Sequence, residues 1–382
     1  MNRICTIIAV NYLPQAMALL DSIRKVYPDI EFWVLITDSQ TKEVPFLSSA
    51  KVLLPEDLEI PATWLQEMRS YYDQVELATS LKPFLLNTLL TEEVTTVTYL
   101  DPDILLFDKL TEGFDAAEEF GIALVPHRLT PANILDPEFL ELELHRYGIF
   151  NLGYICVGHK AQAMLQWWEE RLRWYCTRFP NGVVFTDQKW MNFVPALFDF
   201  KVVKNFGYDF APWNFNERPL SKINEVYFAG ESTLVFIHFS QMSGGLAAGI
   251  GTDLWQKAFN SSDHDTESFE LISALTASYS STLINHKEET SLWAKENTRP
   301  NLPKFHGFHR RESMIQESID KERGDSRRRL GSSKRGKLFI HGSIIARKIE
   351  RSSTLNGARA GFREDCQRLA MKLRGIFKWP QG

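Results

Sequence analysis

The stretch Thr-Thr-Val-Thr-Tyr-Leu-Asp-Pro-Asp-Ile-Leu-Leu-Phe, from Thr95 to Phe107, sets two carboxylates between two apolar runs. Its first six residues are of the β-branched, aromatic and aliphatic types that favour a buried strand. Pro102 disfavours helical geometry at the preceding residue, so the chain stays extended as it leaves the strand. Open α/β sheets bind ligands at the carboxyl ends of their strands. The stretch therefore predicts a central strand that delivers Asp101 and Asp103 to a sheet edge.

The two acids allow two interpretations. Carboxylates this close repel one another unless a cation or hydrogen-bond donors lie between them. A hard divalent ion such as Mg²⁺ or Mn²⁺, held by one or two carboxylates and by substrate phosphates, is a common solution. Asp-Pro-Asp is equally a good turn sequence. The rest of the chain has to decide between a metal site and a simple turn.

The composition is that of an ordinary globular protein, with 44% hydrophobic and 24% charged residues. The 382 residues are enough for two domains, or for one of about 250 to 300 residues with an extension. The four cysteines show no paired spacing, which argues against a disulfide framework or a zinc site and favours a reducing compartment. We expect no signal peptide, because the apolar run at the N-terminus is short, is interrupted by Asn11 and Pro14, and lacks a small-residue cleavage site. We expect no membrane span, because no apolar run approaches about 18 residues.

The charge is unevenly distributed along the chain. From Arg299 to Gly382, 21 Lys and Arg stand against 8 Asp and Glu, although the whole chain carries a net charge of -5. A basic tail on an acidic body suggests an anionic partner. Residues 362 to 379 can form a basic helix on an anionic membrane surface, and a solvated or disordered tail is the alternative. We expect a catalytic domain over residues 1 to 298 and a partly disordered or helical basic extension over 299 to 382.

The first 40 residues have the pattern of a β-α-β unit. We expect a strand from 4 to 10, a helix from 15 to 26 and a strand from 32 to 36. Asn11 and Asp38 then follow neighbouring strand ends. The sequence lacks G-x-G-x-x-G after the first strand and lacks G-x-x-x-x-G-K-[ST], which argues against dinucleotide oxidoreductases and P-loop enzymes.

Three residues in the middle of the chain, Lys82, Gly153 and Asp187, are candidates for a functional site. Residues 63 to 90 look helical in two pieces, and Lys82 in the second piece is either a phosphate contact or a surface lysine. Gly153, inside a predicted strand, marks a close approach of the backbone to another group. Residues 185 to 192 open a predicted helix with Thr186 or Asp187 as its N-cap, and Asp187 is either that cap or a site residue.

Two segments on either side of residue 220 have residue types that suit a sugar ring and phosphate oxygens. The loop from 207 to 218 is rich in aromatic and amide side chains that can stack on a sugar ring and bind its hydroxyls. His238 lies in an apolar strand and is either a core histidine or a ligand. The four glycines between 241 and 251 can expose backbone N–H groups to phosphate oxygens.

Four motifs follow the β-α-β start in order: Tyr-Leu-Asp-Pro-Asp, Phe-Asn-Leu-Gly-Tyr, Thr-Asp-Gln and Ile-His-Phe-Ser. With this order and spacing, residues 3 to 250 resemble GT-A-fold glycosyltransferases, and most of all the glycogenin and galactinol-synthase type. The resemblance implies an α/β fold with a Rossmann-like mixed, mainly parallel sheet, helices on both faces and a loosely structured C-terminal extension. It also implies a metal-dependent hexosyltransferase that uses a nucleotide-diphosphate sugar, UDP-sugar being favoured.

The resemblance assigns roles to individual residues. It gives Asp101, Asp103 and His238 to a divalent metal, for which Mn²⁺ is favoured and Mg²⁺ is the alternative. It places six residues at the donor site: Asn11, Tyr12, Asp38, Lys82, Asn151 and Gly153. It assigns catalysis to Asp187 and Gln188. The segment after His238 departs from the family, because it lacks the Gly-x-x-Lys-Pro-Trp ending.

The stereochemistry of transfer is open. Such enzymes usually retain the anomeric configuration, with Asp187 or Gln188 beside the reacting carbon. An inverting course needs a general base, for which Asp187, Asp209 and Glu217 are the candidates.

The predicted acceptor is a glycan or a lipid-linked saccharide in polysaccharide biosynthesis, and no nucleic-acid partner is expected. We expect a cytoplasmic protein, with peripheral contact at the inner face of a bacterial membrane through the basic tail. The rivals are a non-catalytic sugar- or nucleotide-binding module, a sugar nucleotidyltransferase, and a glycoside hydrolase using Asp187 and Glu217. The nucleotidyltransferase needs an N-terminal glycine-rich loop, which this chain lacks.

Overall fold

A computed structural model describes residues 1–131, 141–178, 184–242, 255, 266–299 and 313–323. The chain divides into two units, Met1–Arg311 and Glu312–Gly382, each considered by itself. In the second unit, residues 313–323 form a helix. The predicted membrane helix from 362 to 379 and the glycine-rich turn after Met242 lie outside the described residues. Among the helices that the structure describes, none combines the length and apolarity needed to cross a bilayer.

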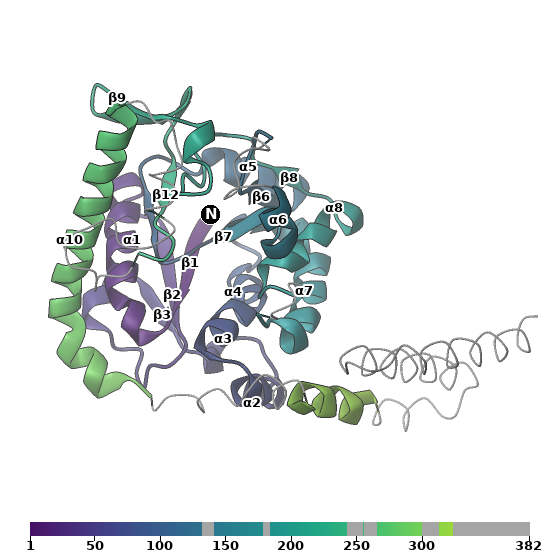
Figure 1. Ribbon diagram of the computed structural model, residues 1–382. Coiled ribbons are helices and arrows are strands. Elements are labelled where there is room, and N and C mark those ends of the chain that lie inside the picture. The colour runs from purple at the N-terminus through teal and green to yellow at the C-terminus, as the bar shows by residue number, and fades with distance from the viewer. Residues whose placement is uncertain (132–140, 179–183, 243–254, 256–265, 300–312, 324–382) are drawn as a thin grey trace, which may run out of the picture. The chain divides into compact units, whose positions relative to one another are not determined.

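A central sheet of seven strands organises the first unit (Figure 1). In spatial order its strands are β3 Lys51–Leu53, β2 Glu31–Ile36, β1 Asn2–Ile8, β4 Thr96–Leu100, β7 Phe150–Gly158, β6 Ile122–Pro126 and β8 Lys201–Val202. β7 runs antiparallel to both of its neighbours, and the other pairs are parallel. The predicted mixed, mainly parallel sheet is confirmed.

The described residues also form two smaller sheets. One is a three-stranded antiparallel sheet of β9 Leu220–Ile223, β10 Val226–Ala229 and β11 Ser232–Thr233. The other pairs β5, Ile104–Leu106, with β12, Phe236–His238, in antiparallel register. In this register His238 lies opposite Ile104, the residue after Asp103. The pairing therefore brings a histidine from late in the chain to the two acids of the central strand.

Helices cover both faces of the central sheet, as predicted (Figure 1). On one face, α1 and α5 contribute to a single apolar core with alternate residues of β1 and β7. On the other, α3 and α4 contact β1, and α4 also packs on α7. The helices up to residue 200 are α1 Leu13–Val26, α2 Ala62–Tyr71, α3 Gln74–Ser80, α4 Lys82–Leu89, α5 Thr111–Phe120, α6 Glu141–Tyr147, α7 Gln162–Tyr175 and α8 Val194–Leu197. The 3₁₀ helices are η1 Val10–Tyr12, η2 Pro45–Leu47, η3 Pro55–Asp57, η4 His159–Ala161, η5 Gln188–Phe193 and η6 Phe215–Glu217.

Two helix predictions were wrong in detail. The segment from 63 to 90 forms three helices, because Asp73 and Glu76 make a capping box that starts α3, and Pro83 sits in the first turn of α4. The helix predicted to open within residues 185 to 192 begins as the 3₁₀ helix η5, and only α8 after it is α-helical.

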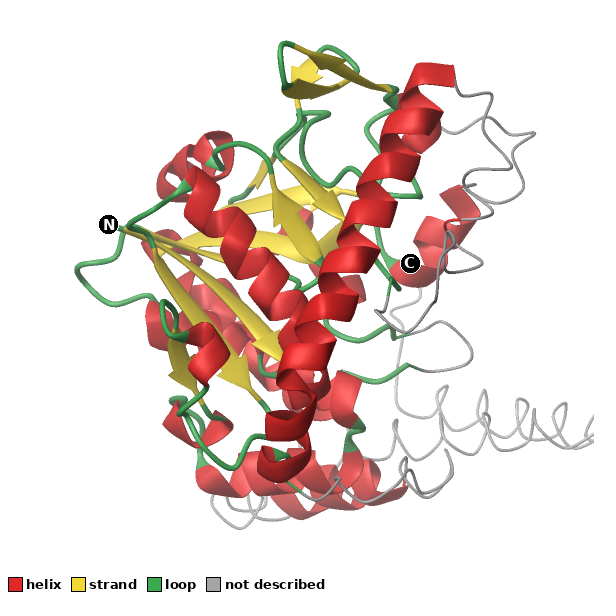
Figure 2. Ribbon diagram, turned by 90° about the vertical axis from the view of Figure 1, so that its left-hand side faces the viewer, coloured by secondary structure: helices red, strands yellow, loops and turns green. Residues whose placement is uncertain are grey.

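The sequence interpretation missed α10, a helix of 32 residues from Thr266 to Asn297. It packs along α1 and against β9 (Figure 2). Its buried face includes Ile272, Tyr279 and Leu283, and threonine and serine fill other buried positions. This mixed face gives a weak apolar period, which is why the pattern was not recognised.

We predict that Glu169→Gln stabilises the protein at pH 8 but not at pH 4. Glu169 is half-buried on α7, where Asn87 Nδ2 donates to its Oε1 at 3.2 Å. Burial raises the pKa of Glu169 from 4.5 to about 7. The folded state therefore binds the proton more tightly than the unfolded state, and stability falls as the pH rises from about 4.5 to 7. The expected gain at pH 8 is about 1–2 kcal/mol, less than the full shift implies because solvent screens the partly exposed side chain, and it is read from urea unfolding at both pH values. An equal gain at pH 4 would contradict the prediction.

Candidate functional site

Two acids and one histidine from three strand ends meet at the carboxyl edge of the central sheet. Asp101 follows β4, Asp103 precedes β5, and His238 closes β12. One ligand atom from each residue lies within 4.8 Å of the others. His238 Nε2 is 3.2 Å from Asp103 Oδ1 and 3.8 Å from Asp101 Oδ2. The predicted grouping is thus present, and its donor set of two carboxylates and one imidazole fits Mn²⁺ or a similar divalent ion.

Backbone hydrogen bonds fix this grouping. Asp101 N–H donates to Gly153 O at 2.8 Å, which ties the end of β4 to β7. Phe239 N–H donates to Asp103 O at 2.8 Å, which ties β12 to the second acid. Ile104 N–H donates to Asp101 O at 3.2 Å, so the Asp-Pro-Asp stretch is also a turn. The turn and the cluster are therefore one structure, and the two interpretations do not exclude each other.

The charges of the cluster balance one another. Burial raises the pKa of Asp101, and the nearby charges of Lys82 and His238 oppose that rise. Burial by itself would lower the pKa of His238, but the carboxylates of Asp103 and Asp209 hold it well above its usual value. The acids are thus kept together by cationic neighbours.

Lys82 is buried, so its interpretation as a surface lysine was wrong. Its side chain is 2% exposed, and Nζ lies 2.6 Å from Asp187 Oδ2. The ammonium also donates to Leu152 O at 2.7 Å, lies 4.2 Å from the centre of the Tyr99 ring and is 3.9 Å from Asp101 Oδ1. Although burial acts to lower it, the pKa of Lys82 is raised by Asp187 and Asp101. Lys82 therefore places a fixed positive charge between the two carboxylates.

Asp187 and Gln188 lie at the start of η5. The side chain of Asp187 makes no capping hydrogen bond, so the cap interpretation was wrong, and its carboxylate faces Lys82 instead. Gln188 Oε1 accepts from Leu152 N at 3.1 Å, and its Nε2 donates to Tyr147 O at 3.0 Å. The amide of Gln188 thus fastens η5 to the strand that carries Asn151 and Gly153.

Gly153 makes the close approach that the sequence predicted. A Cβ atom there would lie 2.5 Å from His238 Cε1. The backbone N–H of Gly153 donates to Asn151 Oδ1 at 2.7 Å. The absence of a side chain is therefore what lets the His238 ring lie against β7.

Gly153→Ala is expected to lower the free energy of unfolding by about 1–3 kcal/mol through overpacking. It should also weaken Mn²⁺ binding, because the new methyl displaces the His238 ring. The matched control is Gly158→Ala at the other end of β7, whose Cβ would lie 2.5 Å from Ala117 O. The control should destabilise the protein without changing the Mn²⁺ affinity. Urea unfolding measures the stability of each variant, and Mn²⁺ titration measures its metal affinity. Equal Mn²⁺ affinities in the two variants would refute the idea that the methyl group acts by displacing the His238 ring.

The predicted nucleoside residues lie around η1. Asn11 is exposed and Tyr12 is 39% exposed. Burial raises the pKa of Tyr12, with further contributions from Asp103 and Asp101, which places its phenol near the acids. Asp38 Oδ1 accepts from Val10 N at 2.7 Å, so it holds η1. The roles of Asn11, Tyr12 and Asp38 in nucleoside binding therefore stay predictions.

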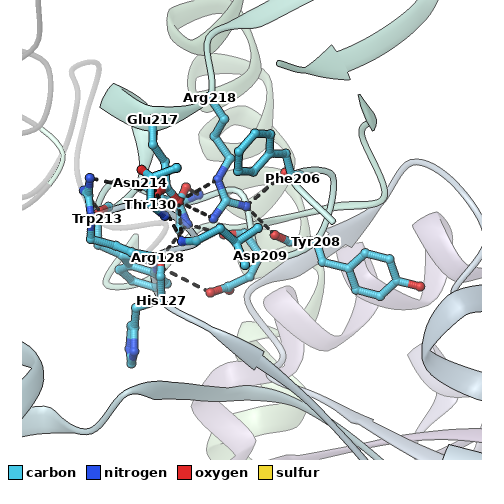
Figure 3. Close-up of polar contacts among 12 residues, drawn as sticks. His127, Arg128, Thr130, Phe206, Tyr208, Asp209, Trp213, Asn214, Glu217 and Arg218 are labelled. Carbon is cyan, nitrogen blue, oxygen red and sulfur yellow. Dashed lines mark hydrogen bonds and ion pairs between the residues drawn. The ribbon is translucent and has the colours of Figure 1, made fainter. Parts of the chain in front are cut away.

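Asp209 and Glu217 are poorly placed to act as a general base. The Glu217 side chain is 2% exposed, pairs with Arg218 at 2.7 Å and accepts from the backbone of Leu129 and Thr130 (Figure 3). Asp209 is 0% exposed and faces His238. The hydrolase interpretation, which needs Glu217 as an acid or base, is disfavoured by these contacts.

The aromatic loop is mostly core. Tyr208, Phe210 and Phe215 are buried, and Trp213 alone among the loop's aromatics is half-buried. Its ring meets that of His238 edge to face, with centroids 5.3 Å apart. The sequence interpretation missed the fully buried Arg218 and the contact between Asp209 and His238, and no local pattern signals either of them.

No protein-family model matches the chain. An uncharacterized protein of Bacillus subtilis (strain 168), YfnF, is 26% identical over 247 residues, which cover 62% of this chain and 80% of that protein.

Several solved glycosyltransferase structures also match. The galactosyltransferase LgtC, in complex with donor and acceptor sugar analogues, is 14% identical with a TM-score of 0.42, covering 71% of this chain and 99% of that chain. Mouse xyloside xylosyltransferase 1 is 12% identical with a TM-score of 0.39, and the match covers 63% of this chain and 98% of that chain. GlyE of Streptococcus pneumoniae TIGR4 is 14% identical with a TM-score of 0.40, and the match covers 81% of this chain and 67% of that chain. A shared architecture at this level does not assign an activity.

Proposed function

We propose that the protein is a metal-dependent glycosyltransferase of the GT-A type, which moves a hexose from a nucleotide-diphosphate donor to a saccharide acceptor. The observation that carries the proposal is the cluster of Asp101, Asp103 and His238 at the carboxyl end of the central strand. The buried Lys82–Asp187 pair beside it adds a second reason, because perturbed ionisable groups concentrate at functional sites.

In this proposal the three cluster residues hold a divalent ion, Mn²⁺ or else Mg²⁺, which neutralises charge on the departing diphosphate when it is bound. The chain itself supplies the rest. Asp187 presents a carboxylate, held by Lys82, to a sugar ring that becomes oxocarbenium-like. Gln188 fixes the backbone of β7, and Asn151 and Gly153 lie beside the donor sugar. Asn11, Tyr12 and Asp38 border the nucleoside.

The finer parts of the proposal concern substrates and location. We propose a UDP-sugar donor, retention of anomeric configuration and a glycan or lipid-linked acceptor in polysaccharide biosynthesis. The basic residues from 299 to 382, 21 against 8 acidic ones, favour contact with an anionic membrane at its cytoplasmic face. Catalysis is assigned to residues 1 to 298.

The second candidate is a sugar- or nucleotide-binding module without catalysis. The Gln188 amide favours it, since its oxygen accepts from Leu152 N and its nitrogen donates to Tyr147 O, which leaves it tied to the backbone. A module binds the nucleotide sugar but does not cleave it. Turnover therefore separates the two candidates.

The test is an assay of UDP release from UDP-glucose, UDP-galactose and UDP-N-acetylglucosamine, each with Mn²⁺ and with EDTA, alone and with a panel of saccharide acceptors. We expect UDP release from one donor in Mn²⁺ only, and more of it when an acceptor is present. Binding of a donor without release in any condition would favour the module, and release that survives EDTA would contradict the metal requirement.

A further inference from the structure

The imidazole of His238 lies between two carboxylates. Its Nε2 faces Asp103 at 3.2 Å, and its Nδ1 faces Asp209 Oδ1 at 3.4 Å. Both Nδ1 and Asp209 Oδ1 are buried, and neither has a hydrogen-bond partner among the residues that the structure describes. A buried donor and a buried acceptor without hydrogen-bond partners lower the stability of the folded state unless they bond to each other. A small turn of the ring would join these two atoms in a hydrogen bond.

Asp209 is fixed in place by its own loop. It is 0% exposed and has a φ of +56°, in the left-handed region that residues other than glycine seldom adopt. Trp213 Nε1 donates to its Oδ2 at 3.2 Å, and Asn214 Nδ2 donates to its backbone O at 2.7 Å (Figure 3). Strained backbone that the surroundings enforce this strongly tends to mark functional positions.

Buried Arg218 holds the loop around Asp209. It is 0% exposed and donates to Phe206 O at 2.9 Å and to Tyr208 O at 2.7 Å (Figure 3). Glu217 Oε1 balances its charge at 2.7 Å. Because Arg218 forms its ion pair with Glu217, the Asp209 carboxylate is not needed to neutralise it. Asp209 Oδ1 faces His238 instead.

The backbone of His238 is locked to the same loop. His238 N–H donates to Phe210 O at 2.9 Å, and Phe210 forms a parallel bridge with Ile237. On its other side the ring lies against Gly153. Two backbone contacts therefore tie the loop to the strand that ends in His238.

We propose that Asp209 is a positioning residue of the metal site: when a metal displaces the Nε2 proton of His238, the Asp209 carboxylate holds the remaining proton on Nδ1, so that the Nε2 lone pair points toward the space between Asp101 and Asp103. Metal-bound histidines commonly give their second ring N–H to a carboxylate, which sets the ring orientation and raises its basicity as a ligand. The inference rests on the proposed metal site and adds to it a residue that does not touch the metal.

The experiment measures Mn²⁺ affinity by electron paramagnetic resonance in the full-length wild type, in Asp209→Asn and in the matched loop control Glu217→Gln. Asn keeps the size of the side chain and removes its charge. We expect Asp209→Asn to weaken Mn²⁺ binding by about 10- to 100-fold. We expect Glu217→Gln to lower the melting temperature and to leave Mn²⁺ affinity unchanged, because Glu217 contacts the loop and not His238.

A double-mutant cycle with His238→Ala decides whether Asp209 acts through the histidine. In the His238→Ala background, Asp209→Asn should have no further effect on the residual affinity. The same fold-loss in both backgrounds would overturn the inference, as would wild-type affinity in Asp209→Asn alone. If the wild type itself binds no Mn²⁺, the proposed metal site fails and the inference fails with it.

Discussion

Lys82→Met is expected to lower the free energy of unfolding by about 3–5 kcal/mol, the usual result of removing one partner of a buried ion pair. Lys82 and Asp187 have side chains 2% and 4% exposed, with 2.6 Å between their charged atoms. Methionine fills the space but leaves the Asp187 carboxylate buried without a cation. The double variant Lys82→Met/Asp187→Asn should recover much of the loss, because neither charge is then left alone.

Urea unfolding at pH 7 measures these differences. Lys25→Met on the exposed side of α1 is the control, and we expect it to stay within about 0.5 kcal/mol of the wild type. A Lys82→Met protein as stable as that control would show that the pair is not held as the structure places it.

Asp103→Asn is expected to reduce the Mn²⁺-dependent release of UDP by about a thousandfold or more. A metal at a departing diphosphate contributes several kcal/mol to the transition state, and each 1.36 kcal/mol is a factor of ten in rate. Asn keeps the shape of the side chain but loses the charge that Asp103 offers beside His238 Nε2. Stability should also fall, because Asp103 is one of the two carboxylates that face the buried His238 imidazole. Activity is therefore compared at a temperature at which the variant stays folded.

The measurement is kcat/KM with a saturating acceptor, beside the melting temperature. The control is Asp115→Asn on the exposed face of α5, which should keep full activity. An active Asp103→Asn protein would exclude the proposed metal role.

Local patterns were enough to predict the buried strands and the two aspartates of the cluster. β1, β2, β4 and β7 are buried, so each appears as a short apolar run that needs no tertiary information. Asp101 and Asp103 were predicted for the same reason, because they follow one such run directly. His238 came from the family pattern, and the pairing of β5 with β12 explains its place.

Features that depend on distant partners escaped prediction. Lys82 looks like a surface residue until Asp187, more than 100 positions later, is brought beside it. Asp209 is one acid in an aromatic loop, and nothing local connects it with His238. The long helix α10 was missed because its buried face mixes threonine and serine with aliphatic and aromatic residues. In each case tertiary contacts override what the local sequence indicates.

The central claim is that the Asp101–Asp103–His238 cluster binds a divalent metal together with a nucleotide diphosphate. The most direct measurement is the melting temperature of the wild type and of Asp103→Asn with UDP, with Mn²⁺ and with both. A ligand that binds the folded state alone stabilises it by about 2.7 kcal/mol at a hundredfold excess over its dissociation constant. We predict that UDP raises the melting temperature of the wild type only when Mn²⁺ is present, and that Asp103→Asn shows no such rise. A wild type that UDP does not stabilise with Mn²⁺, or an equal rise in both proteins, would contradict the claim.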